Sequence, residues 1–282
     1  MDTAPPPFHR FGMGPPRSPV VVSVPHAGRY YPQALADLVS VPMAALVPLE
    51  DRHVDAVAHA ARGDETMLVA SHARAWIDLN RSPDADRDPW IDEGARPAAL
   101  ARSDKVKSGI GLIPRRAGGA DNMWRRKLTD AEVRARIVET HAPYHAALGQ
   151  ALAAARAAFG TAILLDLHSM PPLPGPDPAQ VVLGDRFGRS CPGHVTARIA
   201  GVVRGHGCPV AIDRPYAGGH ILDAHADPRG GVYALQLELD RTLYLDATLD
   251  QPGEGLARTA KTVRAVLDTL ATLADPLRRA AE

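Results

Sequence analysis

Two histidines follow short apolar runs in this chain, and each has polar neighbours that suit chemistry. His168 belongs to the segment Asp166-Leu167-His168-Ser169, directly after the apolar run 161–165, and His26 follows the run 20–24. Apolar runs of this length are typical of interior strands, and open α/β sheets bind their ligands at strand ends. Two histidines at such ends could hold one metal ion.

The acid two residues before His168 favours this interpretation. Asp166 and His168 share one face of the expected strand, because side chains alternate with a period of two. A carboxylate beside a metal-bound imidazole orients the ring. There are plainer alternatives: Asp166 and His168 could satisfy the hydrogen bonds of a turn, and His26 could be a surface or capping residue.

A carboxylate is the expected third ligand, since zinc in hydrolases commonly has three His or carboxylate ligands and one open position. Asp51 is the candidate, at the start of an expected helix over 51–62, although an N-cap role would equally explain an acid there. His141 and His145 have a spacing that suits a metal site on a helix. Because Ala142 stands where a His-Glu-x-x-His motif has its Glu, we interpret the pair as surface or packing residues.

Two more positions could bind or transform a substrate. Asn80 and Arg81 follow an expected strand over 74–79, and an arginine there suits binding of a carboxylate. The alternative for Arg81 is a salt bridge to a nearby acid. Glu238 lies in an expected strand over 232–239, with leucines on the opposite face. A glutamate in an apolar cleft can act as a general base, whereas one on a solvated face would have no such role.

The chain alternates strand-like and helix-like segments, and this indicates an α/β fold with a largely parallel or mixed sheet between helices. Expected strands cover 20–24, 67–71, 74–79, 162–167, 181–184, 210–213 and 232–239. Expected helices cover 51–62, 130–159, 194–205 and 256–273.

The long expected helix carries clear boundary signals. It begins with a capping box at Thr129, Pro143 should kink or split it, and Gly160 should end it. The stretch 82–127 is rich in Pro, Gly and charge, and loops of that length are usually functional covers or locally disordered. No repeat and no clean linker interrupts the chain, so we expect a single domain over 1–282.

Composition excludes several function classes. The chain has 282 residues, 45% of them hydrophobic, and 32 basic against 32 acidic residues, so no overall field attracts nucleic acid or an anionic membrane. No run has the length of a membrane span. Two cysteines cannot form a disulfide framework or a cysteine-rich zinc module. We expect a cytoplasmic protein with a small-molecule substrate; the sequence predicts no oligomeric state.

Taken together, the motifs resemble the N-formylglutamate amidohydrolase family over most of the chain. The segments that carry the resemblance are 23–28, 53–55, 78–81, 143–145, 166–169, 183–185, 218–221 and 235–238. That family is similar to zinc carboxypeptidases and aspartoacylases. The resemblance implies a zinc-exopeptidase-like, three-layer αβα fold with a mixed, mostly parallel central sheet.

The resemblance also implies roles for particular residues. His26 and His168 would bind one zinc ion, with Asp51 as the acidic ligand and Glu50 as its substitute. The α-carboxylate of the substrate would be bound by Asn80 and Arg81. Glu238 would be the general base. Apart from the resemblance, the mechanism that we expect includes a cation near the cleft, such as Arg115, which would help the zinc to stabilise the oxyanion.

The activity implied is zinc-dependent hydrolysis of N-formyl-L-glutamate to formate and L-glutamate, the last step of one route of histidine breakdown. Two alternatives remain at this stage. One is a metallo-deacylase of another N-acylated acidic amino acid, and the other is a non-catalytic carboxylate-binding protein on the same fold.

Overall fold

The computed structural model describes residues 4–96 and 103–281. The chain forms two compact units. The first contains Met1–His9, Pro25–Asp51 and Val69–Ala146, and the second contains Arg10–Val24, Arg52–Leu68 and Ala147–Glu282. The expectation of one domain over 1–282 stays a prediction.

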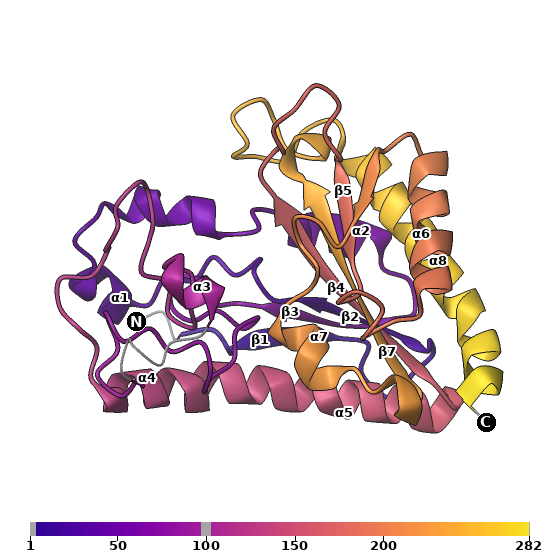
Figure 1. Cartoon of the computed structure of the whole chain (residues 1–282), viewed down its shortest axis with the longest axis horizontal. Coiled ribbons are helices and arrows are strands. Elements are labelled where there is room, and N and C mark those ends of the chain that lie inside the picture. The colour runs from indigo at the N-terminus through magenta and orange to yellow at the C-terminus, as the bar shows by residue number, and fades with distance from the viewer. Residues whose placement is uncertain (1–3, 97–102, 282) are drawn as a thin grey trace. The chain divides into compact units, whose positions relative to one another are not determined.

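A seven-stranded sheet carries the core, in the order β1-β3-β2-β4-β7-β5-β6 (Figure 1). Its strands are β1 Phe8–Phe11, β2 Val20–Val24, β3 Thr66–Ala70, β4 Ala162–Met170, β5 Val181–Gly184, β6 Val210–Ile212 and β7 Val232–Asp240. The pairs β2–β4, β4–β7 and β5–β6 are parallel, and β5–β7 is antiparallel. Every residue of β2 and β4 is buried, as expected for interior strands with helices on both faces.

Helices flank this sheet. Among them, α2 (Val54–Ala61) and α8 (Leu256–Ala281) pack against each other and against β2 and β4, while α6 (Gly193–Gly205) packs on α8, β5 and β6. Figure 1 shows α6 and α8 to one side of the strands and α5 (Ala142–Phe159) to the other. A short helix, α7 (His220–His225), contacts β7. The predicted α/β fold, with a mixed, mostly parallel sheet between helices, is confirmed.

The first unit is built mainly from turns and short helices. Among its described residues, the helical elements include α1 (Gln33–Leu38), a 3₁₀ segment Met43–Leu49, α3 (Asp104–Lys107), α4 (Asp130–Arg136), a π-helical turn Ile137–His141 and the start of α5. Two further 3₁₀ turns, Pro228–Gly230 and Arg241–Leu243, belong to the second unit. The stretch 82–127 is thus largely irregular, as predicted, and its residues 97–102 lie outside the described part of the chain.

The long helix is confirmed over 130–159, with one interruption. Thr129 and Glu132 form the predicted capping box, and Gly160, with φ +79°, ends the helix. The interruption is the π-helical turn Ile137–His141, which ends two residues before Pro143. Proline has no N–H and its ring clashes with the carbonyl four residues earlier, so a wider turn lets the helix continue through it.

Two predictions about local structure are wrong. Residues 74–79 form no strand but a turn, in which the N–H of Trp76 donates to the carbonyl of Ala73 at 2.8 Å. Asp51 is not the N-cap of α2, because the helix begins at Val54 and His53 takes the capping position with φ 55°. An N-cap role therefore does not explain the acid at position 51.

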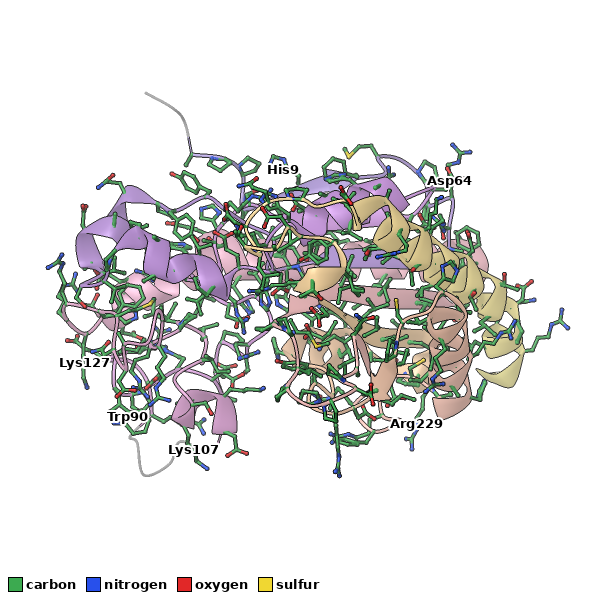
Figure 2. All side chains as sticks on the ribbon, turned by 90° about the horizontal axis from the view of Figure 1, so that it is seen from above. His9, Asp64, Trp90, Lys107, Lys127 and Arg229 are labelled. Atoms are coloured by element: carbon green, nitrogen blue, oxygen red, sulfur yellow. The ribbon has the colours of Figure 1, made fainter. Side chains whose placement is uncertain are left out.

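Charged side chains such as Asp64, Lys107 and Arg229 extend from the surface (Figure 2). In the described part of the chain, no helix combines the length and the apolar character that crossing a bilayer requires.

Candidate metal and carboxylate-binding site

His26 stands in a tightly packed turn after β2. A Cβ atom on Gly28 would lie 2.1 Å from the carbonyl oxygen of His72, so only glycine fits at that position. This close approach explains the glycine of Pro25-His26-Ala27-Gly28 and fixes the backbone next to His26. The His26 side chain is 3% exposed.

Both ring nitrogens of His26 face carboxylates. Nε2 lies 2.7 Å from Asp78 Oδ1, and Nδ1 lies 3.5 Å from Asp51 Oδ2. The first distance is a strong hydrogen bond in which Nε2 donates. The second is long for a hydrogen bond but close to the ~3.4 Å that separates two ligands of a tetrahedral zinc ion with bonds of about 2.05 Å. The N–H of Asp51 also donates to the carbonyl of His26 at 2.9 Å.

Asp78 is ionised although it is fully buried. Burial alone would raise the pKa of Asp78, but the positive charges of Arg74 and Arg81 outweigh burial and hold this pKa well below its ordinary value of 3.8. Arg74 Nε donates to Asp78 Oδ2 at 2.7 Å. A buried carboxylate that accepts from His26 Nε2 leaves Nδ1 as the nitrogen that can bind a metal.

Asp51 and its neighbour Glu50 are both buried, and they differ in their contacts. Tyr31 donates its hydroxyl hydrogen to Glu50 Oε1, whereas the Asp51 carboxylate faces His26 Nδ1. Of the two acids that the sequence offered as the acidic ligand, Asp51 is the one beside His26.

The second unit contains a matching pair of His and Asp. His168 Nε2 lies 2.8 Å from Asp166 Oδ2, and the hydroxyl of Ser23 donates to Asp166 Oδ1 at 2.8 Å. All three residues are at most 2% exposed. The carboxylate predicted to orient His168 does contact it, and a hydrogen on Nε2 makes Nδ1 the nitrogen whose lone pair could bind a metal.

Glu238 is the register partner of His168 on the neighbouring parallel strand, as Gln236 is of Asp166. Partners in a parallel ladder point to the same face of the sheet, so all four side chains share one face. Gln236 Nε2 donates to Glu238 Oε1 at 2.9 Å. Glu238 is buried, so the solvated-face alternative is wrong.

Asn80 and Arg81 lie in a buried turn that we call the Asn80 loop, residues 78–81. The N–H of Asn80 donates to Asp78 Oδ1 at 2.8 Å. Arg81 donates from Nε to the carbonyl of Ile110 at 2.8 Å and from Nη1 to the carbonyl of Asn80 at 2.7 Å. Its Nη2 lies 3.8 Å from Asp78 Oδ2, so the acid near Arg81 is Asp78.

Arg115 is engaged in its own loop. Its Nε lies 3.0 Å from Asp88 Oδ2, Nη1 donates to the carbonyl of Asp121 at 2.7 Å, and the guanidinium lies 5.5 Å from the centre of the Trp90 ring. These contacts alone account for an arginine at this position. A role for Arg115 at the substrate stays a prediction.

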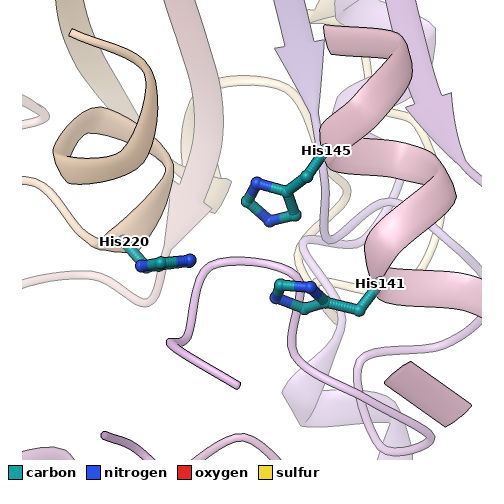
Figure 3. Close-up of side chains that lie close together, drawn as sticks. All are labelled: His141, His145 and His220. Carbon is teal, nitrogen blue, oxygen red and sulfur yellow. The ribbon is translucent and has the colours of Figure 1, made fainter. Parts of the chain in front are cut away.

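His141 and His145 are stacked, with ring centres 4.3 Å apart (Figure 3). His141 is 3% exposed, so the surface interpretation is wrong for it and packing is right. Each ring also contacts the backbone of the Asn80 loop, which the sequence did not indicate. Asp78 as the partner of His26 is the other contact that sequence reasoning missed, and its place in the segment 78–81 was the only signal.

The donor set suits a divalent cation. His26, Asp51 and His168 are buried and of the types that hold such an ion. Nucleophilic catalysis by Cys191 is disfavoured, because burial, assisted by the nearby Asp185, raises the pKa of its thiol to about 12.

Comparisons with known proteins agree with this chemistry. A sequence profile of the N-formylglutamate amidohydrolase family matches residues 18–245. The N-formylglutamate deformylase of Pseudomonas putida is 30% identical over 243 residues, which cover 82% of this chain and 84% of the relative. The protein of the same name from Pseudomonas aeruginosa PAO1 is 30% identical over 264 residues, 90% of this chain and 91% of the relative.

Two solved structures are also similar to this chain. The crystal structure of N-formylglutamate amidohydrolase from Ralstonia eutropha JMP134 has a TM-score of 0.84 at 34% identity, covering 97% of this chain and 99% of that one. A protein of Agrobacterium tumefaciens shares the fold, with a TM-score of 0.66 at 19% identity over 95% of this chain and 96% of its own. The profile match and the deformylase relatives establish that the chain belongs to the N-formylglutamate amidohydrolase family.

Proposed function

We propose that this protein hydrolyses the amide bond of N-formyl-L-glutamate, releasing formate and L-glutamate. The observation that carries the proposal is that two buried histidines each donate Nε2–H to a buried carboxylate, in a chain of this family. As the family resemblance implies, the reaction would be a cytoplasmic step of histidine breakdown.

His26, Asp51 and His168 are the proposed ligands of one divalent ion, which we take to be zinc. Three facts support this. His26 Nδ1 and Asp51 Oδ2 have the separation of two zinc ligands. His168 presents the same ring nitrogen as His26. β2 and β4 run parallel with Ser23 opposite Asp166, and in the sequence His26 follows the end of β2 by two residues.

Zinc bound there would polarise the formyl group and make a bound water acidic near neutral pH. Glu238 would accept the proton of the attacking water and deliver it to the leaving amine nitrogen. Its support is the shared face with His168 and the hydrogen bond from Gln236, which holds one carboxylate oxygen in place.

Asn80 and Arg81 are the proposed binders of the substrate α-carboxylate. Arg81 keeps its guanidinium in one orientation through its bonds to the carbonyls of Ile110 and Asn80. A fixed guanidinium loses little conformational freedom when a carboxylate binds. Arg115 is the proposed cation for the oxyanion, and its Nε also lies 3.0 Å from Asp88 Oδ2.

The test is formate release from N-formyl-L-glutamate by the purified protein, with metal content measured on the same sample. We expect about one zinc ion per chain. Activity should be lost on chelation and regained when zinc is returned. N-acetyl- and N-succinyl-glutamate serve as competing substrates. Faster hydrolysis of either would replace the formyl assignment with another deacylase, and a metal-free active enzyme would refute the metal site.

Glu238→Gln tests the proton-transfer role. The variant keeps the shape and removes the basicity, so it should retain zinc and lose at least about a hundredfold in kcat, the lower end for general acid–base catalysis. Glu254→Gln, at an exposed glutamate, is the matched control and should keep full activity. A Glu238→Gln enzyme with near-normal kcat would remove Glu238 from the mechanism.

A further inference from the structure

The Asn80 loop rests on two histidines that no role yet explains. His141 is the last residue of the π-helical turn Ile137–His141, and His145 lies one turn later in α5 (Figure 3). Residues four apart share a face of a helix. Their rings are nearly parallel, with 20° between the planes.

Each ring contacts a backbone carbonyl of the loop through Nε2. His141 Nε2 lies 2.9 Å from the carbonyl oxygen of Arg81, and His145 Nε2 lies 2.8 Å from that of Leu79. A carbonyl oxygen only accepts, so both Nε2 atoms carry a hydrogen and donate. The two accepting carbonyls stand on either side of Asn80.

The carbonyl of Asn80 itself accepts from Arg81 Nη1 at 2.7 Å. Three consecutive carbonyls, those of residues 79, 80 and 81, are therefore each held by a side chain. The residues are 2–6% exposed, so water cannot readily replace these donors. Of the three donors, only the two imidazoles come from outside the loop, and they fix it to the helix.

We infer that His141 and His145 are positioning residues that set the place of Asn80 and Arg81, and with them the substrate α-carboxylate. This inference rests on the carboxylate-binding role proposed above. The two rings would act on the pose of the substrate without touching it. A stacked pair of rings on a helix is a rigid support, because neither ring can turn without breaking its bond or the stack.

The experiment compares two substrates in several variants. N-formyl-L-glutamate carries the α-carboxylate, and its analogue with an α-carboxamide does not. His145→Leu removes the donor, and His145→Gln keeps an N–H donor at about the same reach. His141→Leu and His141→Gln repeat the comparison. His194→Leu, at an exposed histidine in α6, is the control.

We expect His145→Leu to lose about tenfold in kcat/KM on the carboxylate substrate, mostly through KM, as for one lost hydrogen bond of about 1.4 kcal/mol. On the carboxamide the loss should be at most about twofold, since the loop then binds no charge. His145→Gln should recover most of the activity. Zinc content should stay unchanged in all variants, and His194→Leu should match the wild type.

Equal losses on the two substrates, or a Gln variant no better than Leu, would reduce the pair to a structural role. Loss of zinc in His145→Leu would make it a metal ligand and overturn the inference. If wild-type enzyme hydrolysed both substrates equally well, the Asn80–Arg81 assignment itself would fail. If wild-type enzyme preferred the carboxylate substrate and the His→Leu variants preferred it by the same factor, only the positioning role of the histidines would fail. His145 is partly exposed, so its variants decide the matter should His141→Leu not fold.

Discussion

Replacing Asp166 by Asn tests how the protein prepares His168 to bind a metal. Asp166 is 0% exposed and accepts two hydrogen bonds of 2.8 Å, from Ser23 Oγ and from His168 Nε2. Asn has the same shape. Its oxygen can still accept from His168, and its NH₂ group can donate to the Ser23 hydroxyl, which accepts as well as donates. The variant should therefore fold with both contacts kept.

What changes is the charge behind the imidazole. A carboxylate makes the ring more electron-rich and fixes the hydrogen on Nε2, and both effects strengthen binding through Nδ1. Loss of such a partner typically weakens metal binding by about 10- to 100-fold, or about 1.4–2.7 kcal/mol. We expect a shift of this size in the zinc Kd of Asp166→Asn, measured by competition with a chelator of known affinity.

Ser23→Ala is the control for the same carboxylate. It removes one hydrogen bond from Asp166 and leaves the charge behind His168, so its zinc Kd should change less than that of Asp166→Asn. Unfolding of both metal-free variants in denaturant establishes that they are folded. A zinc Kd within about threefold of wild type in Asp166→Asn would refute the reasoning, since it would show that the charge does not matter to the metal.

Three further predictions concern stability. Thr129→Ala removes the side chain that caps α4 and should cost about 1 kcal/mol in denaturant unfolding. Gly184→Ala places a Cβ 2.6 Å from the backbone carbonyl carbon of Ala217, so the backbone must move to make room. This movement should lower the free energy of unfolding by about 1–3 kcal/mol, seen as a lower melting temperature. Burial alone would raise the pKa of Glu65, but the hydrogen bonds from Arg264 and from the backbone, together with the positive charge of Arg264, lower this pKa. The ion pair thus stabilises the fold fully above pH ~4.3, the pKa of Glu65 in the unfolded chain. This stabilisation is lost as the pH falls through the lower pKa that Glu65 has in the folded protein. Wild type should therefore exceed Glu65→Gln in unfolding free energy near pH 7 by more than near pH 3; a constant difference would contradict this.

The sequence predicted the strands that carry chemistry because they are buried on both faces. Runs composed mainly of apolar residues made β2 and β4 recognisable, and the period of two placed Asp166 with His168 correctly. The same period grouped Gln236 with Glu238. None of these inferences needed a contact between segments far apart in the sequence.

The segment 74–79 shows where such reasoning stops. Its apolar residues suggested a strand, but Trp76 packs its ring 3.7 Å from the guanidinium of Arg136, 60 residues later. Arg136 also donates to the carbonyl of Trp76 at 3.0 Å. Contacts of this kind favour a turn over a strand, and no local pattern reports them. For the same reason the bond between His26 and Asp78 was not foreseen.

The two His–Asp pairs have the same geometry but differ in charge balance, and this difference bears on the role of the metal. The positive charge of Arg74 neutralises Asp78, and Arg81 lies nearby, so side chains of the first unit stabilise this buried carboxylate without a metal ion. Asp166, among the described residues, has hydrogen bonds from Ser23 and His168, neither of which carries a fixed charge. A buried carboxylate without a fixed cation is costly, and a divalent ion at His168 would offset that cost. The charge of Asp166 thus favours occupancy of the proposed metal site, while that of Asp78 chiefly fixes the His26 ring and the Asn80 loop.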